Sequence, residues 1–115
     1  MVEAIKAWGN VSISKHKIPN GLEVILAHIP DLPVFAYYTW FHVGSRREKE
    51  GKTGIAHFFE HLLFKETKNL KEGEFDKIME ENGASTNAAT WVDWTYYYET
   101  LPADPKKVEL VIRLE

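Results

Sequence analysis

The sequence predicts an α+β fold, in which an antiparallel or mixed β-sheet packs against helices. Three observations support this class: a turn signal between two alternating runs near the N-terminus, a long run of β-branched and aromatic residues, and helical apolar spacing from about residue 55. The predicted elements follow in the order strands, helix, helix, strands, helix. Strands and helices that come in separate blocks are typical of this class.

Two short runs near the N-terminus alternate as β-strands do, residues 11–18 (VSISKHKI) and residues 22–29 (LEVILAHI). Between them stands Pro19-Asn20-Gly21, a strong turn signal, so we expect a β-hairpin. After a break at residues 30–33, the run VFAYYTWFHV (34–43) is rich in β-branched and aromatic residues. It predicts a strand that is buried on both faces.

Two helices are predicted after a charged, glycine-bounded loop at residues 44–54. The first covers residues 55–66, where five apolar residues recur at helical spacing and are expected to bury the helix: Ile55, Phe58, Phe59, Leu62 and Leu63. The second covers residues 71–82, with Phe75, Ile78 and Met79 on one side. Gly83 stands where a C-cap glycine belongs.

The last third of the chain predicts two strands and a third helix. Residues 84–92 and 94–101 read as strands with Asp93 near the turn between them. Asp104 and Pro105 are the expected N-cap and first residue of a helix whose apolar stripe is Val108, Val111 and Ile112. Because this helix stops at Glu115 without a C-cap or breaker, we expect residues 1–115 to be an incomplete domain; a short natural terminal helix is the alternative.

Composition excludes several classes of protein. The net charge is −3 with 27% charged and 44% apolar residues, so no basic face supports nucleic-acid binding. The chain has no cysteine, which removes disulfides and cysteine-type zinc sites. No run approaches the roughly 20 apolar residues of a transmembrane helix, and no secretory signal is visible. We therefore expect a cytoplasmic protein with no membrane contact.

The stretch HFFEH (57–61) carries the pattern with the most chemistry. Residues four apart lie on one helix face, so His57 and His61 can direct two imidazoles at one metal ion. Zinc in a catalytic site takes three protein ligands and a water. Glu60 leans to the same side and can accept a proton from that water. The alternative is an apolar helix in which the histidines are packed core residues rather than ligands. We expect both features together: Phe58 and Phe59 anchor the helix, while His57, Glu60 and His61 face the metal.

Longer motifs around HFFEH sharpen this reading. The stretches NGLEVILAHI, FHVGSRREKEGKTGIAHFFEHLLFKET and NGASTNAATWVDWTYYYETLP occur in that order. H-x-x-E-H marks the inverzincins, and the whole pattern resembles the N-terminal part of pitrilysin/insulinase-type (M16) zinc peptidases, which include the mitochondrial processing peptidases. The resemblance covers nearly the whole chain from about Ile18. One departure is Glu66, where the family usually has glycine, and it affects no catalytic position.

The resemblance implies a LuxS/MPP-like metallohydrolase fold, a Zn²⁺ cofactor and endopeptidase activity on peptides or unfolded proteins. By position, His57 and His61 match the zinc ligands and Glu60 the catalytic base. ASTNAAT matches an edge strand to which substrate adds as a further strand. The substrate-binding candidates on this strand are Ala84, Ser85, Thr86, Asn87 and Ala88.

The same resemblance implies a third zinc ligand, a glutamate some seventy-odd residues beyond His61, which is past the end of this chain. Five carboxylates could be considered as substitutes: Asp93, Glu99, Asp104, Glu109 and Glu115. Asp93 fits a turn, Asp104 an N-cap, and Glu109 and Glu115 a solvent-facing helix surface. We therefore expect another chain or a further C-terminal part to complete the site, weak or no activity from this chain alone, and a tendency to form homo-oligomers. The alternative function is a non-catalytic binding or scaffold subunit of the same fold.

Overall fold

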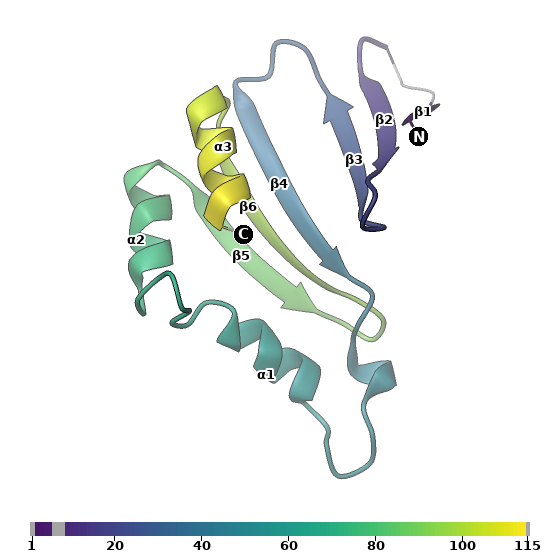
Figure 1. Ribbon diagram of the computed structural model, residues 1–115, viewed down its shortest axis with the longest axis vertical. Helices are drawn as coiled ribbons and strands as arrows, with labels where there is room; N and C mark the ends of the chain where they lie inside the picture. The colour runs from purple at the N-terminus through teal and green to yellow at the C-terminus, as the bar shows by residue number, and fades with distance from the viewer. Residues whose placement is uncertain (1, 6–8, 115) are drawn as a thin grey trace. The chain divides into compact units, whose positions relative to one another are not determined.

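The computed structural model describes residues 2–5 and 9–114, and these divide into two compact units, one that ends at Leu32 and one that begins at Pro33. Each unit is described by itself (Figure 1). The described part of the chain contains strands and short helices, and every strand pairing is antiparallel. The predicted α+β class is thus confirmed. The longest of the described helices has 10 residues, so none of them has the length or apolar character to cross a membrane.

The first unit is a three-stranded meander of β1 (Val2–Ile5), β2 (Ser12–Lys17) and β3 (Glu23–His28). β2 and β3 form the predicted hairpin, in which Lys17 pairs with Glu23 across the turn. The Asn20 side chain accepts the Leu22 N–H at 3.0 Å, which is how asparagine stabilises such a turn. β1 was not predicted from the sequence, because its alternation is too short to stand out.

The second unit is built on a sheet with the strand order β4-β6-β5. β4 spans Val34–Phe41, β5 spans Ser85–Thr90 and β6 spans Thr95–Pro102. The central strand, β6, alternates between buried and half-buried residues from Thr95 to Leu101. Its buried residues are Thr95, Tyr97, Glu99 and Leu101. One face of the sheet therefore carries the packing, and the other presents a row of rings in which Trp40 lies against Tyr96, with centroids 4.6 Å apart and ring planes tilted by 30°.

Three helices accompany this sheet: α1 (Ile55–Leu62), α2 (Glu74–Glu81) and α3 (Pro105–Leu114). A 3-10 turn, η1 (Ser45–Arg47), follows β4. The core joins α2, β6 and α3 through Met79, Leu101 and Val111, which are at most 1% exposed. α2 ends as predicted at Gly83, where the Gly83 and Ala84 N–H groups donate to the Glu80 and Met79 carbonyls at 2.9 Å.

Two packing predictions were wrong. The strand 34–43 was expected to be buried on both faces, yet β4 lies at one end of the strand order and Tyr38 and Trp40 are 50% and 58% exposed. The apolar stripe of α3 was expected to include Ile112, which is 57% exposed, whereas Leu114 packs against the core. The N-cap prediction for α3 is confirmed, because Asp104 Oδ1 accepts the Lys106 N–H at 2.8 Å.

Candidate metal centre

α1 is held at its N-terminus by a carboxylate from the preceding loop. Gly54 occupies the N-cap position with φ of 85°, a left-handed conformation that favours glycine. The two carboxylate oxygens of Glu48 accept the Gly54 N–H at 2.8 Å and the Ala56 N–H at 2.9 Å. These two hydrogen bonds lower the pKa of Glu48 below its ordinary value, and the bond from Ala56 has the larger effect. A negative charge at a helix N-terminus also interacts favourably with the helix dipole.

His57 and His61 converge on one point. Their Nε2 atoms are 3.1 Å apart and their ring centroids 4.6 Å apart. Two nitrogens that each bind zinc at 2.0–2.1 Å with a tetrahedral angle are about 3.3 Å apart. The pair therefore fits zinc with little adjustment, and both Nε2 atoms are positioned to serve as ligands.

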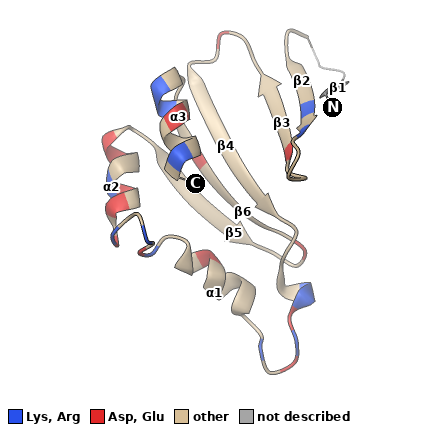
Figure 2. Ribbon diagram, in the orientation of Figure 1, with Lys and Arg blue, Asp and Glu red and all other residues tan. Residues whose placement is uncertain are grey.

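Glu60 is buried rather than exposed beside the histidines. It is 8% exposed, it is the only carboxylate on α1 (Figure 2), and its Oε2 accepts a hydrogen bond from Thr90 Oγ1 of β5. The flanking aromatics behave in the opposite way, since Phe58 and Phe59 are 60% and 59% exposed. The expectation that Phe58 and Phe59 anchor the helix was therefore wrong, as was the wider expectation that Ile55, Leu62 and Leu63 also bury it, because all five are at least 40% exposed. The residues that α1 buries are Ala56 and Glu60.

Thr90 belongs to a small network of hydroxyl groups. Thr95 Oγ1 lies 3.2 Å from Thr90 Oγ1 and 2.9 Å from the Val43 carbonyl oxygen. Thr90 gives its single hydroxyl proton to Glu60, and Thr95 likewise has one proton, which it can donate either to the Val43 carbonyl or to Thr90 but not to both. The Thr95 hydroxyl therefore lies next to the one that binds the buried carboxylate, and the shorter of its two distances is to Val43.

β5 has a strand neighbour on one side only within the described residues, because it ends the order β4-β6-β5. Four of the five substrate-binding candidates, Ser85 to Ala88, lie in this strand. The side-chain oxygen of Asn87 accepts the Ala88 N–H at 2.9 Å. Ala84 precedes the strand and packs against the hydrophobic core. β5 therefore offers main-chain groups at an edge beside α1, to which it is joined by the Thr90–Glu60 bond.

No third ligand joins the two histidines within residues 2–5 and 9–114, where no group of three His, Cys, Asp or Glu side chains could hold a metal ion. Asp93 forms an ion pair with Arg46 at 3.0 Å, and Glu109 pairs with Arg113 at 2.7 Å. Glu99 is 2% exposed on β6. Glu115 lies outside the described residues.

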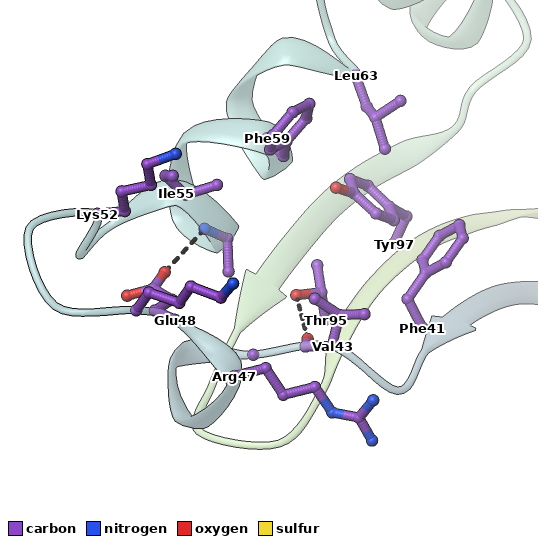
Figure 3. Close-up of a pocket in the computed structure, with 13 residues that line it drawn as sticks. Phe41, Val43, Arg47, Glu48, Lys52, Ile55, Phe59, Leu63, Thr95 and Tyr97 are labelled. Carbon is purple, nitrogen blue, oxygen red and sulfur yellow. Dashed lines mark hydrogen bonds between the residues drawn. The ribbon is translucent and has the colours of Figure 1, made fainter.

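A largely apolar pocket of about 560 Å³ lies on the other side of α1 (Figure 3). Ile55, Phe59 and Leu63 line it from the helix, and Phe41 and Tyr97 line it from the sheet. Successive residues of an α-helix are rotated by about 100°, so His57, two positions after Ile55, points about 200° away. The pocket and the two histidines therefore occupy opposite flanks of α1.

The loop that leads from β4 to α1 is fixed against the turn between β5 and β6. The Ser45 and Arg46 N–H groups donate to the Trp91 and Val92 carbonyls at 3.0 and 2.9 Å. Gly44 lies so close to this turn that a Cβ atom there would be 2.3 Å from the Trp91 carbonyl oxygen. This main-chain contact brings the start of α1 and the end of β5 together.

The model of the insulinase family (peptidase family M16) matches residues 23–112. The chain is 46% identical over 90 residues to zinc protease PqqE of Helicobacter pylori, and these residues make up 75% of this chain and 20% of that protein. It is 36% identical over 97 residues to the mitochondrial-processing peptidase subunit beta of Saccharomyces cerevisiae, with 83% and 21% covered. A crystal structure of a protease from Helicobacter pylori superposes with a TM-score of 0.83 at 39% identity, covering 89% of this chain and 24% of that one. The chain thus spans about a fifth of the length of these relatives.

Proposed function

Because the chain belongs to the insulinase family of peptidases, family M16, we propose that it forms the zinc-binding part of a zinc-dependent endopeptidase. His57 and His61 supply two of the ligands through their Nε2 atoms, and Glu60 is the general base. The observation that carries the proposal is the convergence of the His57 and His61 Nε2 atoms, which are 3.1 Å apart. The buried Glu60 directly precedes His61 on the same helix. The relatives named as zinc proteases support the same metal and reaction class.

Each residue of the site has a separate task in this reaction. Zinc, when it is bound, supplies a Lewis acid that makes a water molecule acidic enough to lose a proton near neutral pH. Glu60 accepts that proton on the carboxylate oxygen that is not bonded to Thr90. It can later pass the proton to the leaving amine. The free side of β5 holds a peptide or unfolded protein segment in an extended conformation through main-chain hydrogen bonds. The candidates for this contact are Ser85 to Ala88, with Ala84 at the entry to the strand.

The remaining ligand comes, in this proposal, from polypeptide other than residues 1–115, either from a further part of the protein or from a partner chain. Two imidazoles hold zinc weakly compared with the three ligands of a catalytic site. The short span of the chain relative to its relatives supports this view. Residues 1–115 alone are therefore expected to have weak or no peptidase activity.

Zinc binding provides the first test, measured by competition with a coloured chelator on the purified chain and on His57→Ala, His61→Ala and Glu60→Gln variants. We expect weak binding by the wild type, a loss of at least tenfold in affinity for either histidine variant, and near wild-type affinity for Glu60→Gln. Equal zinc affinity in His57→Ala and the wild type would refute the ligand assignment.

Peptidase activity provides the second test, with an unstructured peptide as substrate and the longest form of the protein that carries this sequence. Glu60→Gln is expected to lower kcat by about 10²–10⁴-fold, the usual contribution of a general base. Strong zinc-dependent cleavage by residues 1–115 alone would contradict the proposed need for more polypeptide. Zinc absent from both forms would favour a scaffold subunit.

A further inference from the structure

We propose that Thr90 is a positioning residue that fixes the orientation of the Glu60 carboxylate. This inference rests on the proposed function, because it gives Thr90 a task only if Glu60 is the base. It is based on the hydrogen bond from Thr90 Oγ1 to Glu60 Oε2, which joins residues 30 positions apart in the sequence.

The burial of Glu60 makes this bond important. A carboxylate that is 8% exposed loses most of its hydration, and this is costly unless hydrogen-bond donors replace the water. The Thr90 hydroxyl is such a donor, and it comes from a strand rather than from the helix itself. A side chain with three rotatable bonds is thus tied at its end to a rigid element.

The two carboxylate oxygens acquire different roles as a result. Oε2 accepts from Thr90, so Oε1 is the oxygen that accepts the proton from the water. Thr95 is 6% exposed, and its Oγ1 lies 3.2 Å from the Thr90 Oγ1. The Thr90 hydroxyl lies between the Glu60 carboxylate and Thr95, so its rotation is restricted, and this restriction passes to Glu60.

The position of Thr90 also links the base to the substrate strand. Thr90 is the last residue of β5, and side chains alternate along a strand, so Thr90 shares a face with Ala88 while its main chain continues the same edge. A peptide that pairs with β5 is therefore held by the same strand that orients Glu60. The scissile bond and the base are then aligned by one element, and this alignment is what a proximity effect requires.

Three variants in the full-length protein isolate this role. Thr90→Val removes the hydroxyl with little change in shape, and Thr90→Ser keeps the hydroxyl. Thr100→Val is a matched control, because Thr100 is a half-buried threonine on β6 whose cross-strand partners are Ala36 and Ser85.

The first readout is the side-chain carboxyl ¹³C resonance of Glu60, which is independent of catalysis and is assigned by its absence in Glu60→Gln. This resonance should move in Thr90→Val and remain in place in Thr90→Ser and Thr100→Val. Zinc affinity should stay within about twofold of the wild type in all three variants.

The second readout uses any preparation in which the wild type cleaves peptide. Thr90→Val should lower kcat by about 10–100-fold with KM nearly unchanged, the usual range for a residue that orients a catalytic group, and Thr90→Ser should restore most of the rate. An unmoved Glu60 resonance in Thr90→Val, or a serine variant as slow as the valine variant, would overturn the inference. If no preparation cleaves peptide, the proposed activity fails, whereas the carboxyl resonance still decides whether Thr90 holds Glu60.

Discussion

α1 and α2 are both eight residues long, yet the side chains that they bury are of different kinds. α2 buries Met79 in the core, and its acidic residues are exposed. α1 buries Ala56 and Glu60 and leaves Phe58 and Phe59 about 60% exposed. The comparison shows that α2 is placed by apolar contacts, whereas α1 is placed by polar ones, namely Glu48 at its N-terminus and Thr90 beside Glu60. The helix that carries His57 and His61 is therefore the one that depends more on polar contacts for its position.

The largest effect on stability is expected from Met79→Ala in α2. Met79 is 1% exposed and contacts Leu101 and Val111, so its truncation leaves a cavity and should lower the free energy of unfolding by about 2–5 kcal/mol. Phe59→Ala in α1 is the comparison variant, and it should cost less than about 1 kcal/mol because the side chain is 59% exposed. Urea unfolding followed by circular dichroism measures both. A larger cost for Phe59→Ala would show that α1 is placed by apolar contacts after all.

A smaller effect is expected from Gly44→Ala, which acts on the route from β4 to α1. The backbone of Gly44 is extended, so alanine suffers no conformational strain there, but its Cβ would lie 2.3 Å from the Trp91 carbonyl oxygen and 2.5 Å from that of Val92. Relief of this overlap should cost about 1–3 kcal/mol. Thermal unfolding measures the loss. Gly51→Ala is the comparison variant, because Gly51 has a positive φ of 78° and a Cβ there would meet nothing within 4 Å. It therefore measures the cost of backbone strain without an overlap, whereas Gly44→Ala measures the cost of an overlap without backbone strain.

The contrast between the helices also explains what could be predicted from the sequence. The hairpin, the C-cap at Gly83 and the N-cap at Asp104 were predictable because their signals lie within a few residues of each other. Likewise, the spacing of His57 and His61 on a helix fixes their convergence. The Thr90–Glu60 bond spans 30 residues and leaves no local pattern, so it could not be found. The capping role of Glu48 was not predictable either, because the capping patterns that a sequence shows span about three residues, whereas Glu48 accepts the Ala56 N–H from eight residues away.

The next prediction concerns Glu48 and pH. Its pKa is lowered in the folded state, chiefly by the hydrogen bond from the Ala56 N–H, so its stabilising contribution is present above the ordinary pKa of 4.5 and is lost as pH falls through the lower folded-state value. The N-terminus of α1 should therefore loosen at acid pH while α2 remains in place. Hydrogen exchange of the Gly54 and Ala56 amides should rise relative to that of amides in α2 as pH falls, after correction for intrinsic rates.

Two variants separate the capping bond from charge in general. Glu48→Gln should raise exchange at Gly54 and Ala56 already at neutral pH, because one amide oxygen replaces two carboxylate oxygens. Glu72→Gln is the control, since the pKa of Glu72 is also lowered but through Lys65, which follows the C-terminal end of α1 rather than its N-terminus. If both variants affect these amides equally, the capping role of Glu48 is wrong.

The smallest change in stability is expected from Phe58→Ser on α1. Phe58 is 60% exposed, so the free energy of unfolding should change by no more than about 0.5 kcal/mol. The variant should nevertheless reduce self-association, because Phe58 adds to an exposed apolar surface that also includes Phe59, Leu62 and Leu63. Sedimentation velocity over a range of concentrations measures this, with Lys77→Ser on the exposed side of α2 as the control. Loss of stability without a change in association would mean that Phe58 is packed within its own chain, and the difference between the two helices would then be smaller than their exposed residues indicate.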